Sequence, residues 1–493
     1  MADTPLHFKA EARESAATKD YDLIVIGSGS AMNIVDPMVR ENPGMKIAVI
    51  DKDEPGGICL TRGCIPSKIL LYPAELVRLT EKAREFGIAT EIRSVDFGRV
   101  MARMRSLIDA DIDSIRQGLT SSENIDYFHD VAEFVAPYTL GVGGQTIRSK
   151  MIFLCTGSQP VIPPVKGLKE AGYMTSDEAL HLKKLPASVA VIGGGYIAAE
   201  LGHFLAAMGS KVTIIGRNPQ FIPEEEPEVS EVLRGELGAH MTIMTNIEVR
   251  EAASSGGVKT LTAVDRESGR EVTVTAEAIL VAAGRGPTSG FLHPEKGGVQ
   301  TDEKGWIKVD DYLETTQPGV WAMGDADGRF LFKHVANYES EVVYYNAVLK
   351  RRVKADYHAV PHAVFTYPEA AGVGMKEADA VKMLGKDELL IGFYRYEDTA
   401  KGEAMAAKRY FVKVIMERGT ERILGAHVAG PYASMLIQEL VNAMYTGDQG
   451  PADLRRSMYI HPALNEVVQR ALDSVYSVDE YHHVLSHEHG HQD

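Results

Sequence analysis

The chain has 493 residues, of which 45% are hydrophobic, and its formal net charge is −16 at neutral pH. This length predicts several domains with ordinary globular cores. The acidic excess argues against nucleic acid or an anionic membrane surface as a main partner. No run of 18 apolar residues is present, which excludes a membrane-spanning helix, and residues 1–20 lack the apolar centre of a secretory signal. We therefore expect a cytoplasmic protein.

Two segments repeat the pattern of strand, glycine turn, helix and strand. The first is "YDLIVIGSGS" followed by "KIAVID", and the second is "SVAVIGGGYIAAELGHFLAAMGSKVTIIGRN". Both are typical of doubly wound α/β domains that bind dinucleotides. After about residue 358, strand-like runs precede the helical run "MLIQELVNAMYTG". The predicted fold is therefore α/β, with two Rossmann-type domains and a C-terminal α+β domain.

The first glycine turn predicts a site for the pyrophosphate of a dinucleotide. Gly27 and Gly29 fill the first two positions of GxGxxG and allow a phosphate to approach the backbone at a helix N-terminus. Asp51, 24 residues after Gly27, is placed to accept hydrogen bonds from a ribose diol. The third position holds Met32, so the helix is expected to pack differently on its strand.

The second glycine turn has Gly193, Gly195 and the permitted variant Ala198. Its second strand ends at Gly216 and Arg217, where an NAD site usually has an acidic residue and an NADP site an arginine. This ending favours NADP(H), whereas a solvated loop arginine is the alternative. The following "NPQFIPEEEPE" carries glutamates that would repel a phosphate. We expect both nicotinamides to be used, with a modest preference for NADP(H).

The stretch "GGICLTRGCIPSK" contains two of the three cysteines, Cys59 and Cys64. Their spacing is too wide for a thioredoxin-type CxxC, and the further spacing of a zinc site is missing. Disulfide staples are rare in a reducing compartment, so a close pair of thiols suggests redox chemistry.

Six motifs, in order, resemble those of the FAD-dependent pyridine nucleotide–disulfide oxidoreductases, over the chain from about Tyr21 to Tyr476. They are "GGICLTRGCIPSK", "CTGSQP", "AAGRGP", "GVWAMGDA", "VFTYPEAAGVG" and "YIHPALNE". The resemblance implies bound FAD, a nicotinamide nucleotide and a homodimer. It implies an FAD domain in 21–160, a nucleotide domain in 161–286, a second FAD-binding part in 287–357 and an interface domain in 358–478. The chain also has a polar N-terminal extension (1–20) and a His-rich tail (479–493), and the tail is expected to be frayed.

The resemblance also implies residue roles. Cys64 is the flavin-facing, charge-transfer thiol with a lowered pKa, and Cys59 is the interchange thiol. The third cysteine, Cys155, stands at a position that is usually Ala and is expected to be packed. His461 and Glu466 form the catalytic base pair, contributed by the opposite subunit. The other implied positions are a lysine–glutamate pair (Lys68, Glu200), a nicotinamide gate (Tyr196) and further cofactor-binding residues (Gly57, Gly157, Gly284, Arg285, Gly324, Asp325).

The motifs that identify the family specify the substrate less closely, and several substrates are ranked. Dihydrolipoyl dehydrogenase, acting on a small dithiol or a lipoyl-carrying protein, ranks first by a narrow margin. Second is a low-molecular-weight disulfide reductase of the mycothione reductase kind, which "SGSAMNIVD", "LFKHVAN" and "IHPAL" resemble. Mercuric reductase ranks lower because paired cysteines near the C-terminus are missing. A redox-silent structural subunit conflicts with the intact Cys and His–Glu pairs. His487, His489 and His491 would chelate a metal only in an ordered tail, so no metal site is predicted.

Overall fold

The computed structural model describes residues 18–489, which form two compact units. The first unit contains the segments up to residue 57, 112–158 and 287–355, and the second contains 58–111, 159–286 and the chain from 356 onward. Residues 58–111 were assigned from the sequence to the FAD domain. They belong to the second unit, where helix α3 (Cys64–Lys82) packs against α7 (Tyr196–Met208).

A five-stranded parallel sheet in the order β18-β8-β2-β3-β4 forms the centre of the first unit. The sequences LIVI and IAVI of two central strands are buried on both faces, as in parallel sheets covered on both sides. These strands are β2 (Leu23–Ile26), β3 (Ile47–Ile50), β4 (Ile125–Phe128), β8 (Ile152–Leu154) and β18 (Val320–Ala322).

The two faces of this sheet are covered differently. Helix α1 shares one hydrophobic cluster with Leu23 and Val25, and the chain at the end of α9 contributes to the same cluster. On the other face, Ile24 and Ile26 pack with residues of a second sheet, in the order β1-β7-β6-β5. The covering elements are α1 (Met32–Glu41), α9 (Lys333–Val343), β1 (Lys19–Asp20), β5 (Ala132–Ala136), β6 (Thr139–Val142) and β7 (Gln145–Arg148).

The second unit contains another parallel sheet, in the order β12-β11-β10-β16, and helix α7 packs against its strand β11. A three-stranded antiparallel sheet, in the order β13-β14-β15, is formed by the chain between β12 and β16. The strands are β10 (Ser188–Ile192), β11 (Lys211–Ile215), β12 (Thr242–Met244), β13 (Ile247–Ser255), β14 (Val258–Asp265), β15 (Glu271–Ala276) and β16 (Ala278–Val281).

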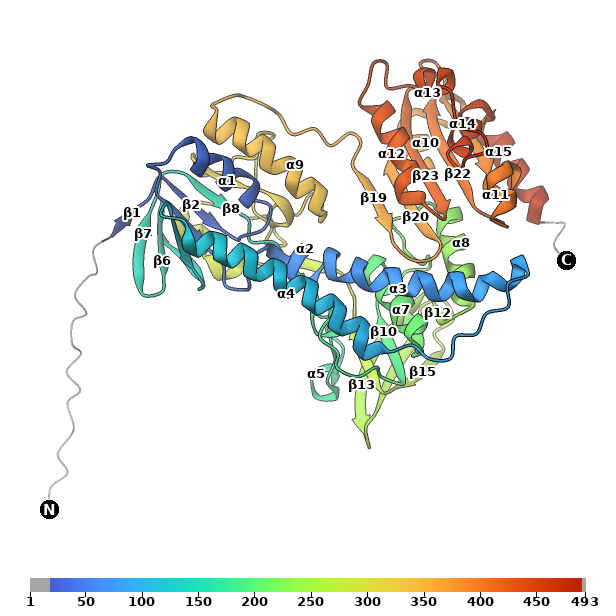
Figure 1. Cartoon of the computed structure of the whole chain (residues 1–493), viewed down its shortest axis with the longest axis horizontal. Helices are drawn as coiled ribbons and strands as arrows, with labels where there is room; N and C mark the ends of the chain where they lie inside the picture. Colours follow the sequence, from blue (N-terminus) through green and yellow to red (C-terminus); the bar gives the residue numbers. More distant parts are fainter. Residues whose placement is uncertain (1–17, 490–493) are drawn as a thin grey trace. The chain divides into compact units, whose positions relative to one another are not determined.

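The C-terminal part of the second unit is a six-stranded antiparallel sheet in the order β19-β20-β23-β22-β21-β24. Helices α12, α14 and α15 lie against its strands, as Figure 1 shows in orange and red. The α/β fold class and the predicted C-terminal α+β domain are confirmed. The elements are β19 (Pro361–Val364), β20 (Glu369–Gly374), α10 (Glu377–Leu384), β21 (Leu389–Arg395), β22 (Phe411–Glu417), β23 (Ile423–Gly430), α12 (Ala433–Met444), α14 (Glu466–Asp473), β24 (Val475–Tyr476) and α15 (Val478–His489).

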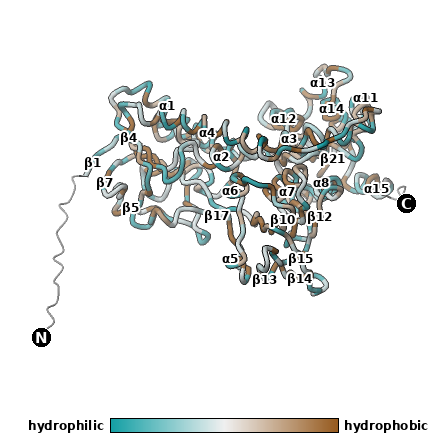
Figure 2. The backbone as a smooth tube through the Cα atoms, turned by 60° about the horizontal axis from the view of Figure 1, so that its bottom comes forward, coloured by the Kyte–Doolittle hydropathy of each residue, from teal (hydrophilic) through white to brown (hydrophobic). Residues whose placement is uncertain are grey.

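Hydrophilic and hydrophobic residues alternate along the long helices α3 and α4, as expected of helices that bury one face (Figure 2). None of the helices among residues 18–489 is long and apolar enough to cross a membrane. The other elements are α2 (Gly57–Arg62), α4 (Phe97–Ser121), α5 (Leu168–Ala171), α6 (Ser176–Ala179), α8 (Pro227–Gly238), α11 (Ala400–Ala404), α13 (Ala452–Arg456), β9 (Ser158–Pro160) and β17 (Arg285–Pro287).

The expectation of a frayed tail is wrong for most of its length, because α15 continues to His489. Tyr481 anchors this helix: its ring is buried and its hydroxyl donates to Glu228 at 3.0 Å. Of the three histidines considered for a metal, His491 lies outside the described residues, whereas His487 contacts His483 at 3.1 Å. At the other end, Lys19–Asp20 of the polar extension form β1, and the rest of the extension lies outside the described residues.

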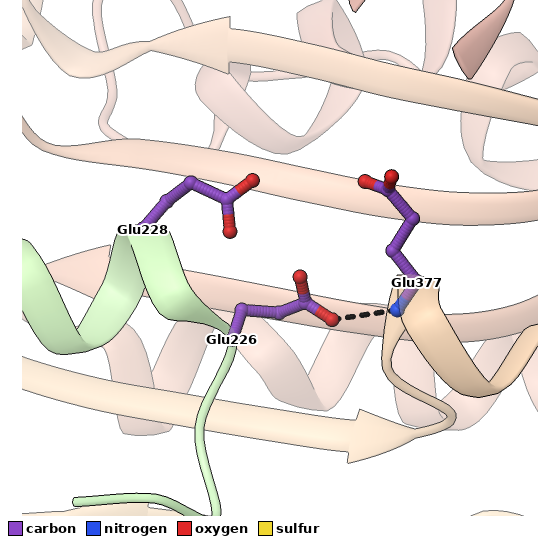
Figure 3. A group of neighbouring side chains, drawn as sticks. All are labelled: Glu226, Glu228 and Glu377. Atoms are coloured by element: carbon purple, nitrogen blue, oxygen red, sulfur yellow. Dashed lines mark hydrogen bonds between the residues drawn. The ribbon is translucent and has the colours of Figure 1, made fainter. Parts of the chain in front are cut away.

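Lys413 lies at the centre of a buried ion cluster that ties α8 to the six-stranded sheet. Its ammonium is 2.8 Å from Glu226, 3.0 Å from Glu228 and 2.7 Å from Glu377, and its side chain is 0% exposed. Figure 3 shows the three carboxyl groups, with Glu226 also accepting the backbone N–H of Glu377 at 2.6 Å. The three glutamates have the spacing of metal ligands, but the lysine ammonium serves as their counter-ion.

Candidate active site

The first glycine turn and Asp51 meet at the carboxyl end of β2 and β3 in the first unit. Gly27 has φ 101°, and a Cβ there would lie 2.1 Å from the Cys155 carbonyl oxygen, so only glycine fits. One Asp51 oxygen accepts the backbone N–H of Ser28 at 2.8 Å and its hydroxyl at 2.6 Å. The carboxylate is thereby held beside the turn. Cys155 packs against the neighbouring core, and burial raises the pKa of its thiol.

A second loop completes this turn. A Cβ on Gly57 would lie 2.6 Å from the Gly29 Cα, so the two glycines allow two backbone segments to approach closely. The Gly56 N–H donates to the Ser28 hydroxyl at 3.0 Å, which joins the same segments. The sequence supplied these glycines as separate motifs, and the fold brings them together.

The other positions of the first unit lie around η4 (Gly324–Ala326). The Ser158 hydroxyl donates to the Asp325 carboxylate, and the Gly324 N–H donates to Glu339 at 2.5 Å. Thr288 holds the adjoining segment by donating to the Gly157 carbonyl at 3.0 Å. Glu339 is fully buried and was not identified from the sequence, because a glutamate inside a helix carries no local signal of its partner.

Cys59, in α2, and Cys64, the first residue of α3, have their thiols in hydrogen-bonding contact. Gly63 allows the close turn between them, since a Cβ there would lie 2.8 Å from the Ile58 carbonyl oxygen. The hydrogen bond to Cys59, followed by burial, raises the pKa of Cys64, while the charge of Lys68 lowers it. The cause of this rise is the second sulfur, because negative charge on Cys59 disfavours another thiolate beside it. The lowered pKa implied for Cys64 beside a flavin stays a prediction.

Lys68 lies one helical turn after Cys64 and contacts Glu200 of α7. Its ammonium donates to both carboxylate oxygens of Glu200, at 2.9 and 2.7 Å, and lies 4.7 Å from the centroid of the Phe365 ring. Glu200 also accepts the backbone N–H of Phe365 at 3.0 Å. The implied pair is thus in contact, and an aromatic ring holds the lysine from a second side.

The second glycine turn follows β10. A Cβ on Gly193 would lie 2.0 Å from the Ala282 carbonyl oxygen, and Gly195 caps the start of α7. Gly216 continues β11 by donating its N–H to the Met244 carbonyl at 2.8 Å. Arg217 follows it and is exposed. Of the neighbouring crossover residues, Gly284 accepts the Val161 N–H at 2.9 Å and Arg285 begins β17.

Tyr196, the first residue of α7, has partners that the sequence did not predict. Its ring stacks on His362 with centroids 5.9 Å apart. His362 pairs with the fully buried Glu225 at 2.9 Å. Burial, followed by the charges of Glu225 and Glu224, raises the pKa of Tyr196. The tyrosine is therefore kept neutral and held against an imidazole–carboxylate pair. These partners come from other elements, so no local pattern marks them.

His461 and Glu466 form a hydrogen-bonded pair in the second unit. The imidazole Nδ1 lies 2.9 and 3.1 Å from the two carboxylate oxygens, and one oxygen also accepts the Ala463 N–H at 3.2 Å. The hydrogen bond from His461 is the main cause that lowers the pKa of Glu466. The His461 side chain is 72% exposed, so Nε2 is the nitrogen that would exchange a proton with a substrate.

Glu439, which no sequence motif identified, supports the loop that carries His461. Glu439 of α12 accepts hydrogen bonds from the Tyr459 hydroxyl and the Asn465 amide, both at 3.2 Å. Tyr459 and Asn465 lie on either side of His461 in the chain. Glu439 therefore holds both ends of the segment that carries the imidazole.

Both glycine turns fit a dinucleotide. Within the described chain, no side chain caps the N-terminus of α1 or of α7, so their first N–H groups suit a pyrophosphate. At the first turn, Gly27, Gly29 and Gly57 allow the close backbone packing of a dinucleotide turn, and Asp51 would supply the ribose acceptor expected of an FAD site. At the second turn, Gly193 and Gly195 would hold a nicotinamide nucleotide in the same way. FAD would supply two-electron redox chemistry between that nucleotide and the cysteine pair.

Comparisons with known proteins agree with this arrangement. The family model described as "Pyridine nucleotide-disulphide oxidoreductase" matches residues 21–343, and the dimerisation domain of the same family matches 360–472. The chain is 33% identical to mycothione reductase of Mycobacterium tuberculosis over 463 residues, which covers 92% of this chain and 98% of that protein. It is 32% identical to dihydrolipoyl dehydrogenase of Synechocystis sp. over 473 residues, with the same coverage.

A solved structure is similar over nearly its whole length. It is the Cu(II) complex of the HOCl-induced flavoprotein disulfide reductase RclA from Escherichia coli, with a TM-score of 0.81 and 26% identity. The match covers 92% of this chain and 99% of that one. The family matched here uses FAD and NAD(P)H. Because the two family domains span most of the sequence, the chain belongs to the pyridine nucleotide-disulphide oxidoreductase family.

Proposed function

We propose that this flavoenzyme reduces a low-molecular-weight disulfide with electrons from NADPH, through the Cys59–Cys64 pair. The turn that places the two thiols side by side, together with the His461–Glu466 pair, carries this proposal. A thiolate is the form that attacks a disulfide, and the family resemblance gives this role to Cys59. Cys59 is therefore the sulfur assigned to the substrate.

The exchange proceeds in two balanced steps. His461 first takes the Cys59 proton. Cys59 then attacks one substrate sulfur, forming a mixed disulfide, and the other substrate sulfur leaves and takes this proton from His461. Cys64 then attacks Cys59, which closes the protein disulfide and releases the second substrate thiol; His461 takes up the Cys64 proton and passes it to this thiol. Two electrons and two protons pass from the protein dithiol to the substrate. Glu466 holds Nδ1 of His461, so that Nε2 carries the proton.

NADPH is proposed because the end of β11 has Gly216 and Arg217 where an acid would repel the 2′-phosphate. The sequence-based ranking placed dihydrolipoyl dehydrogenase first. We reverse that order on this ground and on the slightly higher identity to mycothione reductase, 33% against 32%. Dihydrolipoyl dehydrogenase stays the second candidate, since a relative of that name is almost equally similar. It would run the same sulfur exchange in the opposite direction.

The test compares kcat/KM for two reactions of the FAD-loaded enzyme. One is NADPH oxidation with a panel of low-molecular-weight disulfides, and the other is NAD⁺ reduction by dihydrolipoamide. We expect the first to be faster, and Cys59→Ser to abolish both, while Cys155→Ala retains both. A dihydrolipoamide reaction that dominates with NAD⁺ would overturn the choice of substrate and leave the sulfur chemistry intact.

A further inference from the structure

A second arginine lies beside Arg217 at the end of β11. Arg266 stands in the turn between β14 and β15, and its Nη1 donates to the Arg217 carbonyl oxygen at 3.1 Å. The backbone fixes this turn, because the Arg266 N–H donates to the Asn246 carbonyl at 2.9 Å and the Asn246 N–H donates to Asn218 at 2.8 Å. Both arginines are exposed at the surface. The fold thus places two cations where the sequence showed only one.

Two of the glutamates that follow β11 contact partners inside the protein. Glu225 and Glu226 have buried side chains and pair with His362 and Lys413, at 2.9 and 2.8 Å. Both carboxyl groups are therefore buried in the protein and are not exposed at the strand end as Arg217 is. This weakens the repulsion that the sequence suggested for a phosphate near Arg217.

Two of the remaining acids near this position have other surroundings. The Glu224 carboxylate lies beside the second glycine turn, 3.9 Å from where a Cβ of Gly195 would be. Asp265, next to Arg266, accepts the backbone N–H groups of Ser268 and Glu267, and these bonds lower its pKa. Glu267, exposed in the same turn, is the acid that remains beside the two arginines.

We propose that Arg217 and Arg266 together bind the 2′-phosphate of NADP(H). This rests on the proposed use of NADPH. In a doubly wound domain the adenosine ribose lies outside the carboxyl end of the second strand, which is β11 here. One N–H of Arg266 holds the Arg217 carbonyl, and its other N–H groups present a fork that matches a phosphate. Arg266 is the specificity residue that the sequence pattern does not reveal.

The experiment measures binding of 2′,5′-ADP and of 5′-AMP to the FAD-loaded full chain by titration calorimetry. The wild-type protein is expected to bind 2′,5′-ADP more tightly. Arg266→Gln, which retains an amide donor for the Arg217 carbonyl, should weaken 2′,5′-ADP binding about 5- to 30-fold, as for one partly screened charged hydrogen bond. Its binding of 5′-AMP should be unchanged, which shows that the fold is intact. Arg217→Gln should likewise weaken the binding of 2′,5′-ADP and leave the binding of 5′-AMP unchanged.

Arg250→Gln is the matched control, because this arginine lies on the neighbouring β13 and pairs with Glu248 at 2.6 Å. It should leave the binding of both ligands unchanged. If Arg217→Gln weakens 2′,5′-ADP and Arg266→Gln does not, the assignment of Arg266 is wrong and the NADPH preference stands. If the wild type binds both ligands equally, the NADPH preference itself fails.

Discussion

At the scale of single residues, the two sulfurs of the active site act on each other. The hydrogen bond to Cys59 is the main cause that raises the pKa of Cys64 in this dithiol form. A thiol's reactivity follows its share of thiolate, so labelling of the two sulfurs tests the proposed role of Cys59 as the sulfur that meets the substrate.

We expect limited alkylation of the dithiol form to modify Cys59 before Cys64. The enzyme would be reduced, treated with less than one equivalent of iodoacetamide near neutral pH, and mapped by mass spectrometry. Cys155 should stay unmodified because it is packed in the core. Preferential labelling of Cys64 would reverse the assignment of the two sulfurs.

The His461–Glu466 pair is expected to act only in the sulfur exchange. His461→Gln should slow that half-reaction by roughly 10²–10⁴-fold, the usual contribution of a positioned acid–base group. Glu466→Gln retains a partner for Nδ1 and should cause a smaller loss. Stopped-flow measurement of each half-reaction checks this, and an equal loss in reduction by NADPH would contradict it.

The lowered pKa of Glu466 sets the pH below which the His461–Glu466 pair loses the charge of its carboxylate. The pKa of Glu466 is lowered in the folded protein, chiefly by its hydrogen bond to His461. A carboxylate with a lowered pKa retains its charge above its ordinary pKa of about 4.3 and loses it only as pH falls through the lowered value. The pair is thus intact across the neutral and mildly acidic range.

At the scale of elements, the Lys413 cluster joins α8 to β22 and α10. Burial alone would lower the pKa of Lys413, but Glu228, Glu226 and Glu377 outweigh it and raise the value. The contribution of Lys413 to stability is therefore complete below about pH 10 and is lost only as pH rises through the raised pKa. Burial opposes the charge of Glu228 too, but Lys413 lowers its pKa, so its contribution is lost only on acidification.

Lys413→Met should lower the free energy of unfolding at pH 7 by about 3–5 kcal/mol, because three carboxylates are left buried without a cation. The loss should shrink as pH falls towards 5, where these carboxylates can take up protons. Urea unfolding at both pH values measures it. Lys386→Met, which removes an exposed pair with Asp479, is the control and should change little. A loss independent of pH would show that packing, not charge, is responsible.

At the scale of the whole molecule, the dimerisation-domain match supports a homodimer. The chain by itself exposes apolar side chains close to His461, including Met458, which is 100% exposed, and Ile460, which is 79% exposed. Large exposed apolar groups gathered in one region are typical of an interface. Met435 of α12 is exposed in the same domain.

We predict that Met435→Asp combined with Met458→Asp shifts the protein from dimer to monomer in sedimentation velocity at micromolar concentration. The monomer should lose sulfur exchange and still oxidise NADPH with a small artificial electron acceptor. The matched control is Met383→Asp, an equally drastic change at an exposed methionine of α10. A double variant that stays dimeric would place the interface elsewhere.

The sequence by itself determined the features that depend on neighbours in the chain. Gly27, Gly193 and the Cys59–Cys64 spacing were recognisable because tight turns and close backbone approach demand specific residues at short range. The strands LIVI and IAVI were recognisable because continuous apolar runs suit a sheet buried on both faces. Family membership followed from the order of such local motifs.

Only the tertiary structure decided the partners of charged side chains. The sequence around Lys413 does not predict its contacts with Glu226, Glu228 and Glu377. The sequence around Arg217 likewise does not predict its contact with Arg266. The raised pKa of Cys64 likewise depends on where the Cys59 sulfur comes to lie. The physical reason is that local patterns report backbone conformation and burial, whereas an ion pair depends on which distant elements pack together. A charge can therefore be read from the sequence, but its counter-charge comes from the fold.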